Sequence, residues 1–129
     1  MVLDLPSFSR GRLQRELKYW NRMQPVGFKH HVTNDNIYRW IIEWTPQPGT
    51  LYAGDIFKFQ VDFPVDYPYE PPSIIFLDPI PLNEHVYSNG VICIDILLRH
   101  IWSAGISIET ICLSILSMFV DCKAKVAGL

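Results

Sequence analysis

The chain has 129 residues, 49% of them hydrophobic and 19% charged, with 11 basic and 13 acidic side chains and a formal net charge of −2. This is the length of one domain of roughly 100–200 residues, so we expect residues 1–129 to form a single domain. The hydrophobic fraction excludes a disordered chain. The nearly balanced charge offers no general field for nucleic acid or anionic lipid, so we expect neither as a partner.

The chain shows no signal for a membrane or for secretion. No stretch reaches the roughly 18 uncharged apolar residues of a membrane-spanning helix, and residues 1–10 have no apolar leader segment. The three cysteines are an odd number and form no metal-binding CxxC pair: Cys93, Cys112 and Cys122. We therefore expect a soluble cytoplasmic or nuclear protein with reduced thiols and no metal site.

The first element is an amphipathic helix near the N-terminus. Its apolar residues recur every three to five positions: Phe8, Leu13, Leu17 and Trp20. Either Ser7 or Ser9 is expected to cap its start, and the segment 24–27 with Pro25 and Gly27 ends it. The opposite face is basic: Arg12, Arg15, Lys18 and Arg22. From the pattern alone, a solvated face and a docking face explain these charges equally well.

Strands follow from Phe28 to Phe76. Residues Ile37–Trp44 are β-branched and aromatic, Ile56–Phe63 alternates between apolar and polar, and Ser73–Phe76 is a short apolar run. Short links between successive strands favour an antiparallel meander of four strands. The segment 63–72 holds four prolines and must lie outside the sheet. Its Tyr67–Pro68 bond is a candidate cis peptide.

A long loop and a second helix complete the chain. The loop, from Asp78 to Trp102, carries apolar residues that predict a packed segment: Val86, Ile92, Ile94, Ile96 and Leu97. The helix is predicted over Ser107–Lys123, with one apolar face: Ile108, Ile111, Cys112, Ile115, Leu116 and Phe119. The order of helix, strands, loop and helix predicts an α+β fold.

The three cysteines are expected to differ in reactivity. Cys112 lies on the apolar face of the last helix and is expected in the core, whereas Cys122 lies at the helix end near lysines. Cys93 follows the turn Ser88-Asn89-Gly90 in an irregular loop and is the candidate nucleophile. His85, eight residues earlier, could act as a base or simply hold the loop, and the spacing does not decide between these roles.

Several motifs in fixed order resemble those of the ubiquitin-conjugating enzymes. They are the run Tyr67–Pro72, the run His85–Leu97 around Cys93, the pair Trp102-Ser103 and the apolar helix. The chain is most similar to the W-type branch, which shares His-Val-Tyr-Ser-Asn-Gly before the cysteine and a helix like Cys112–Met118. The resemblance covers residues 8–125 and implies the fold of that family, with residues 1–129 ending about two helices short of its usual length.

The resemblance implies a site around Cys93. This cysteine would carry ubiquitin as a thioester, which a substrate amine then attacks. The family usually has His-Pro-Asn before the cysteine, and here Asn83-Glu84-His85 takes that place. His85 would therefore donate to the oxyanion of the intermediate in place of the asparagine. Residues expected to support the loop are Asn83, Tyr87, Asn89 and Asp95.

A second departure concerns the acceptor amine. Many family members have an acidic residue beyond the helix, where this chain has Lys123-Ala124-Lys125. At pH 7 a lysine with a pKa near 10.4 is neutral about once in 2,500 molecules, and an α-amine near 7.7–8.0 about once in six to ten. A site without the acid is better matched to α-amino termini, which is the preference of W-type enzymes.

The resemblance also implies partners and a docking surface. The partners would be ubiquitin, an activating enzyme, a RING or U-box ligase and a protein substrate, with no cofactor. Residues expected to bind the activating enzyme or ligase are Arg12, Arg15, Tyr69, Trp102 and Ala104. Ala104 stands where the family usually has proline.

Two functions remain open at this point. The first is an active carrier and transferase. The second is a catalytically impaired binding module of the same fold, suggested by Asn83-Glu84-His85 and by the missing C-terminal helices. Because impaired relatives typically lose the cysteine and Cys93 is kept, the enzyme is favoured.

Overall fold

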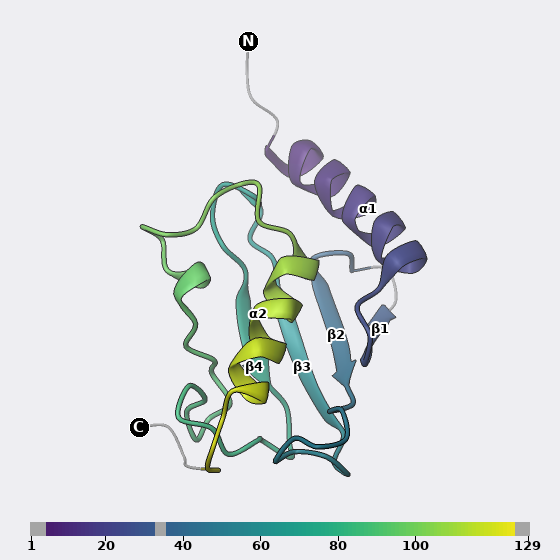
Figure 1. Cartoon of the computed structure of the whole chain (residues 1–129). Helices are drawn as coiled ribbons and strands as arrows, with labels where there is room; N and C mark the ends of the chain where they lie inside the picture. Colours follow the sequence, from purple (N-terminus) through teal and green to yellow (C-terminus); the bar gives the residue numbers. More distant parts are fainter. Residues whose placement is uncertain (1–4, 33–35, 126–129) are drawn as a thin grey trace.

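The structure is a computed structural model that describes residues 5–32 and 36–125 (Figure 1). Its elements follow the predicted order, which confirms the α+β class. They are α1 (Leu5–Met23), β1 (Phe28–Val32), β2 (Arg39–Trp44), β3 (Phe57–Asp62), β4 (Ser73–Phe76), the 3-10 helix η1 (Asp95–Leu97) and α2 (Ile108–Val120). No helix in these ranges combines the length and apolar character needed to cross a bilayer.

The four strands form one antiparallel sheet in the order β1-β2-β3-β4, so the predicted meander is confirmed. Successive side chains of a strand point to opposite faces. In β2 this places Trp40, Ile42 and Trp44 on one face, where all three are buried. Arg39 and Glu43 lie on the other face, which is more exposed.

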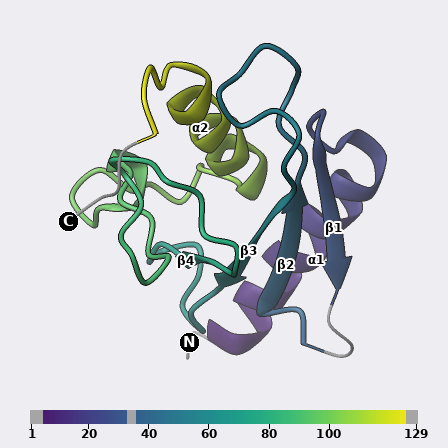
Figure 2. The same ribbon diagram turned by 90° about the horizontal axis from the view of Figure 1, so that it is seen from below.

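Both helices pack on the same face of the sheet. The ring of Trp20 in α1 meets that of Trp40 at 6.3 Å between centroids, and Phe119 in α2 meets Trp44 at 4.7 Å. Trp40 and Trp44 share one face of β2, so α1 and α2 do too. Figures 1 and 2 show α2 across the strands and α1 beside β1 and β2. The core is therefore an aromatic layer between this face and the two helices.

Helix α1 starts earlier than predicted. It begins at Leu5, so Ser7 and Ser9 lie inside it, and the prediction that one of them caps the helix is wrong. Ser9 is buried, and its hydroxyl donates to the carbonyl oxygen of Pro6 (3.2 Å). A serine that bonds back to an earlier carbonyl in this way is tolerated inside a helix.

The apolar face of α1 is confirmed except at its first residue. Leu13 and Trp20 are buried and Leu17 is partly buried against the core. Phe8 instead is 43% exposed and stacks on the ring of Tyr69, with 5.6 Å between centroids. The period of the helix predicted that Phe8 faces the core. Its ring instead packs on Tyr69, an exposed ring of the proline-rich segment.

The predicted strands are confirmed, with narrower ends. β2 begins at Arg39 because Ile37 and Tyr38 form a turn, which the Arg39 N–H closes on the Asn36 carbonyl oxygen (3.2 Å). β3 lacks one residue at each end of the predicted Ile56–Phe63, and β4 matches its predicted range.

Helix α2 ends three residues before the predicted Lys123. Its start is capped by Ser107, whose Oγ accepts from the Thr110 N–H (3.3 Å). At its end the Cys122 N–H bonds the carbonyl oxygen of Phe119 (3.3 Å), a tighter turn than that of an α-helix. The residues after Val120 therefore leave the helix axis.

The proline-rich segment 63–72 lies outside the sheet, as predicted. The candidate Tyr67–Pro68 peptide bond is cis, and the bond Asp78–Pro79, for which no prediction was made, is cis as well. The segment is anchored at Tyr67, which is fully buried.

The long loop after β4 covers the edge of the sheet. The Phe76 N–H bonds the Gly90 carbonyl oxygen (2.7 Å), and Ile75 and Val91 form an isolated bridge. Gly90 has φ +92°, and a Cβ there would lie 2.2 Å from the carbonyl oxygen of Phe76. A residue with a side chain cannot approach β4 so closely. Val86 and Ile92 are buried, as predicted for a packed loop.

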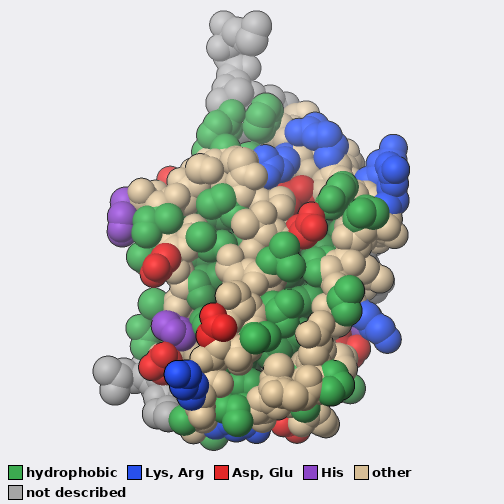
Figure 3. Space-filling view, in the orientation of Figure 1, with side chains coloured by type: hydrophobic (Ala, Val, Ile, Leu, Met, Phe, Trp, Pro, Cys, Tyr) green, Lys and Arg blue, Asp and Glu red, His purple; other side chains and the backbone are tan. Residues whose placement is uncertain are grey.

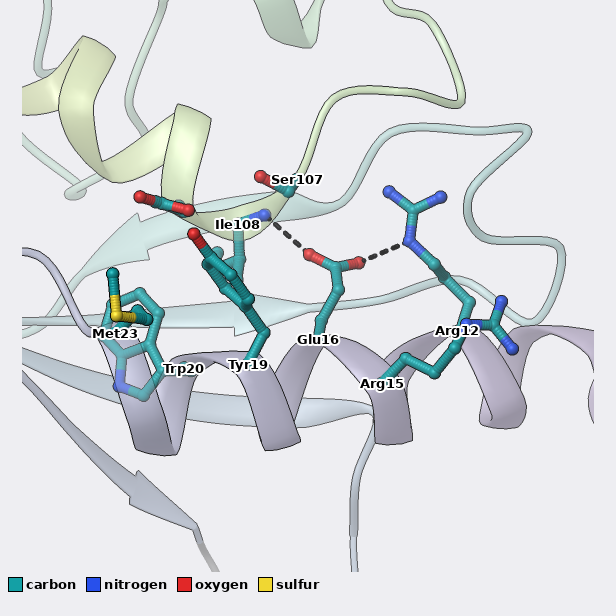
Figure 4. A pocket seen from close by; sticks show the side chains of 9 residues that line it. Arg12, Arg15, Glu16, Tyr19, Trp20, Met23, Ser107 and Ile108 are labelled. Carbon is teal, nitrogen blue, oxygen red and sulfur yellow. Dashed lines mark hydrogen bonds and ion pairs between the residues drawn. The ribbon is translucent and has the colours of Figure 1, made fainter.

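A buried carboxylate joins α1 to two other segments. Glu16 is 9% exposed and accepts from Arg12 Nε–H (2.9 Å) and from the Ile108 N–H at the start of α2 (2.8 Å), as Figure 4 shows. It also accepts from the Tyr67 hydroxyl. Burial and the neighbouring Glu16 carboxylate raise the pKa of Tyr67, so its hydroxyl keeps its proton. The negative charge at the N-terminus of α2 also complements the helix dipole.

We expect Glu16→Gln to lower the free energy of unfolding by about 3 kcal/mol, because it leaves the half-buried Arg12 without its counter-ion. Urea denaturation measures the loss. The control is Glu70→Gln, which removes the exposed pair with Arg99 (3.0 Å) and should cost less than about 1 kcal/mol. Equal losses in both variants would contradict a structural role for Glu16.

We expect Gly90→Ala to destabilise the protein more than Gly54→Ala. Both glycines have positive φ, +92° and +95°, but Gly54 faces open space. The shared backbone strain costs about 1–2 kcal/mol, and the overlap with the Phe76 carbonyl should add about 2 kcal/mol at Gly90. Urea denaturation of the two variants gives the difference, and equal midpoints would show that the loop can move away from β4.

Candidate active site

The loop brings Cys93 and His85 together through their backbones. Val86 and Ile92 form an antiparallel bridge, and just beyond it the Cys93 N–H donates to the His85 carbonyl oxygen (2.7 Å). The spacing of eight residues did not show whether Cys93 and His85 are neighbours in space. This small hairpin places them side by side. The side chains of both residues are exposed.

The tip of this hairpin is a turn that contains two of the predicted support residues. The Tyr87 N–H bonds the Val91 carbonyl oxygen, and the Gly90 N–H bonds that of Tyr87 (both 2.9 Å). The Asn89 Oδ1 accepts from the Val91 N–H (3.1 Å). Asn89 and Tyr87 therefore shape the turn that leads into Cys93.

The triplet before Val86 splits into one buried and two exposed side chains. Asn83 is 1% exposed, and its Oδ1 accepts from the His85 N–H (2.8 Å). Glu84 is exposed, and its Oε1 lies 3.4 Å from His85 Nε2. Asn83 thus holds the loop from inside, while Glu84 and His85 face solvent beside the thiol.

A pocket of about 350 Å³ opens beside Cys93. Its walls come from the loop, from η1 with the predicted Asp95, and from one face of α2 and the residue pair that follows it. The residues from the α2 side are Ser114, Ser117, Met118, Asp121 and Cys122. Their spacing of three and four residues marks a helix face beside the apolar face, a signal that the sequence contained.

The expectation that the chain lacks an acidic residue here is wrong. Asp121 lines the same pocket as Cys93, and Glu84 and Asp95 line it as well. The prediction failed because it placed the helix end at Lys123. With α2 ending at Val120, Asp121 lies in the turn that faces the pocket.

The three cysteines differ in their exposure, and the burial predicted for Cys112 is confirmed. Cys112 is fully buried, and burial raises the pKa of its thiol well above the ordinary value. Cys122 is half-buried, and its thiol donates to the Ala124 carbonyl oxygen (2.9 Å). Cys93 is exposed at the pocket. Within residues 5–32 and 36–125, no three His, Cys, Asp or Glu side chains gather as a metal site would require.

Two of the predicted docking residues point inward. Arg12 is 19% exposed and donates through its two terminal nitrogens to the carbonyl oxygens of Ala104 (2.7 Å) and Ile106 (3.1 Å). Trp102 is 9% exposed and donates from Nε1 to the Pro68 carbonyl oxygen (2.7 Å). These residues join α1, the proline-rich segment and the loop before α2. Whether they also touch a partner stays a prediction.

The other docking residues are accessible. Tyr69 is 54% exposed beside Phe8, and Arg15 is exposed on α1. Figure 3 shows Lys and Arg side chains gathered over α1. Arg15 also lines a pocket of about 430 Å³ between α1 and the start of α2, together with Tyr19 and Met23 (Figure 4). The basic residues of α1 and exposed rings thus lie close together, and whether a partner binds them stays a prediction.

Comparison with known proteins gives consistent results. The family model described as "Ubiquitin-conjugating enzyme" matches residues 12–127. A curated relative, "Probable ubiquitin-conjugating enzyme E2 16" of Arabidopsis thaliana, is 54% identical over 121 residues, which cover 94% of this chain and 74% of the relative. "Probable ubiquitin-conjugating enzyme E2 W" of Dictyostelium discoideum is 40% identical over 115 residues, 89% of this chain and 76% of that protein.

Solved structures agree with these sequences. The human ubiquitin-conjugating enzyme E2 G1 superposes with a TM-score of 0.83 at 34% identity and covers 95% of this chain and 100% of its own. UbcA1 from Agrocybe aegerita gives a TM-score of 0.85 at 31% identity over 93% of this chain and 87% of its own. The chain thus belongs to the ubiquitin-conjugating enzymes, transferases whose general partners are ubiquitin, an activating enzyme and a ligase.

Proposed function

We propose that Cys93 accepts the C-terminal carboxyl group of ubiquitin as a thioester and transfers it to an amine of a protein substrate. The observation that supports this proposal is the exposure of the Cys93 thiol at a pocket, next to His85. By contrast, Cys112 is buried and the Cys122 thiol is hydrogen-bonded. A thiolate is both a good nucleophile and a good leaving group, as two successive acyl transfers require.

Each transfer exchanges one bond to the carbonyl carbon. In loading, the Cys93 thiolate attacks the thioester on the activating enzyme, a new C–S bond forms, and the donor thiolate leaves. In discharge, the neutral amine attacks, a C–N bond forms, the bond to Cys93 Sγ breaks, and the amine nitrogen loses a proton to a base. Both steps pass through a tetrahedral oxyanion.

His85 is the proposed donor to that oxyanion. Its backbone carbonyl is bonded to the Cys93 N–H, so the imidazole extends from a point fixed relative to the thiol. The Glu84 carboxylate lies 3.4 Å from Nε2, and a ring protonated on both nitrogens can bond Glu84 through Nε2–H while it donates Nδ1–H to the oxyanion. Losing one oxyanion donor costs about 10²–10³ in rate in enzymes where it has been measured.

The proposed acceptor is an α-amino terminus. The support is the larger neutral fraction of an α-amine at pH 7, about one in six to ten against about one in 2,500 for lysine, together with the similarity to relatives named E2 W. The argument from a missing acid no longer applies, because Asp121 lines the pocket. Its carboxylate could orient either kind of amine.

The proposed ligase is of the RING or U-box type and binds across Tyr69, Arg15 and Ala104. Tyr69 offers an exposed ring and Arg15 an exposed charge, a combination typical of small transient interfaces. Arg12 and Trp102 support the surface from below through Ala104 and Pro68.

The first test is loading. With activating enzyme, ubiquitin and ATP, we expect a mass shift on a non-reducing gel that a thiol reductant removes. Cys93→Ala should abolish the shift, and the control Cys122→Ala should keep it. An adduct that survives Cys93→Ala, or none with the wild type, would contradict the carrier function, and the latter result would favour a binding module of the same fold.

The second test is acceptor choice, measured as discharge of the isolated thioester at pH 7. We expect a lysine-free peptide with a free N-terminus to react at least tenfold faster than an N-acetylated peptide with one lysine, because its neutral fraction is about 250 times larger or more. His85→Ala should slow discharge to either peptide by about 100-fold. Equal rates for the two peptides would overturn the α-amine proposal while leaving the carrier function standing.

A further inference from the structure

A tyrosine far from Cys93 in sequence reaches the active-site loop. Tyr52 lies between β2 and β3 and is 1% exposed. Its ring packs against Phe119 (4.8 Å between centroids), Phe57 (6.1 Å) and Trp44 (6.3 Å). These core contacts fix the ring, and with it the position of the hydroxyl oxygen.

The Tyr52 hydroxyl meets three groups from two segments beside the pocket. It donates to the carbonyl oxygen of Leu82, accepts from Asn83 Nδ2 (3.3 Å), and lies 3.4 Å from Cys122 Sγ. Burial raises the pKa of Tyr52 to about 12, so the hydroxyl keeps its proton at neutral pH. A phenol has one hydrogen, and the Leu82 carbonyl takes it.

This arrangement decides which way the Asn83 amide points. Since the hydroxyl hydrogen is used at Leu82, the oxygen presents a lone pair to Asn83, and only the NH₂ end of the amide can bond to it. The Oδ1 end must then face the His85 N–H, from which it accepts a hydrogen bond (2.8 Å). Asn83 is 1% exposed, so water is a poor substitute for either contact.

Hydrogen bonds connect Asn83 to Cys93 through the backbone of His85. The His85 backbone is held on one side by Asn83 Oδ1 and on the other by the Cys93 N–H (2.7 Å). We propose that Tyr52 is a positioning residue of the Cys93 site: its hydroxyl orients the Asn83 amide, which fixes His85 at the thioester. This inference rests on the proposed function, because it assigns Tyr52 to the discharge step.

The test is Tyr52→Phe, which removes the hydroxyl and keeps the packed ring. We expect loading of Cys93 to stay within about twofold of wild type, because loading depends chiefly on the thiolate and on docking to the activating enzyme. Discharge to the free-N-terminus peptide should fall about tenfold, since small displacements of a catalytic group lower rates steeply. The matched control is Tyr38→Phe, whose hydroxyl bonds Ser9 and Pro6 instead, and should leave both rates unchanged.

A double-mutant cycle with Asn83→Leu tests whether Tyr52 acts through Asn83. If it does, the double variant discharges at the rate of Asn83→Leu alone. Independent roles would multiply the two effects. A wild-type discharge rate in Tyr52→Phe, multiplied effects, or equal losses of loading and discharge would each overturn the proposal.

Amide hydrogen exchange provides a readout that needs no ubiquitin. We expect the His85 amide to exchange at least tenfold faster in Tyr52→Phe than in Tyr38→Phe, since Asn83 no longer holds its N–H. Unchanged protection would contradict the proposal. A protein that shows this change but forms no thioester would refute the proposed function and leave the link from Tyr52 to His85 intact. Should Tyr52→Phe fail to fold, exchange at His85 in Asn83→Leu tests the second half of the link.

Discussion

The carboxylate of Glu16 is the contact on which the arrangement of three surface segments depends. It receives Arg12 from its own helix, the first backbone N–H of α2, and the hydroxyl of Tyr67 from the proline-rich segment. Arg12 then extends the set to the carbonyl groups of the loop before α2. Burying a charge is costly unless it is paired and fully hydrogen-bonded, so these segments are held together or the carboxylate is left unsatisfied.

Near Cys93, a neutral hydroxyl group joins segments in the same way as the Glu16 carboxylate does. Tyr67 and Tyr52 both have fully buried rings, and both lie in segments without regular secondary structure. Tyr67 bonds Glu16 beneath the surface proposed for the ligase, and Tyr52 bonds Leu82 and Asn83 of the loop that carries Cys93. Long loops provide few backbone ladders of their own, so they depend on such side-chain bonds for a single conformation.

Much of the fold followed from local patterns. β-Branched and aromatic composition identified β2, period-two alternation identified β3, and the apolar face of α2 was confirmed at its buried positions. The site was harder, because its partners come from different segments. The motif singled out Cys93 and His85 as candidates, but Asp121 was missed through an error of three residues at a helix end. Tyr52 was missed because an aromatic residue before β3 gives no sign of where its hydroxyl points. Its role depends on long-range packing.

The bonds around Arg12 and Trp102 also bear on how fast partners can exchange. A surface whose loops are already fixed loses little conformational entropy when a partner docks, so recognition does not require a slow ordering step. Such an interface can remain small and weak yet still be specific, because shape rather than area carries the discrimination. If the ligase binds at Tyr69 and Ala104 as proposed, the rigid loops beneath them would favour brief, repeated encounters over stable complexes.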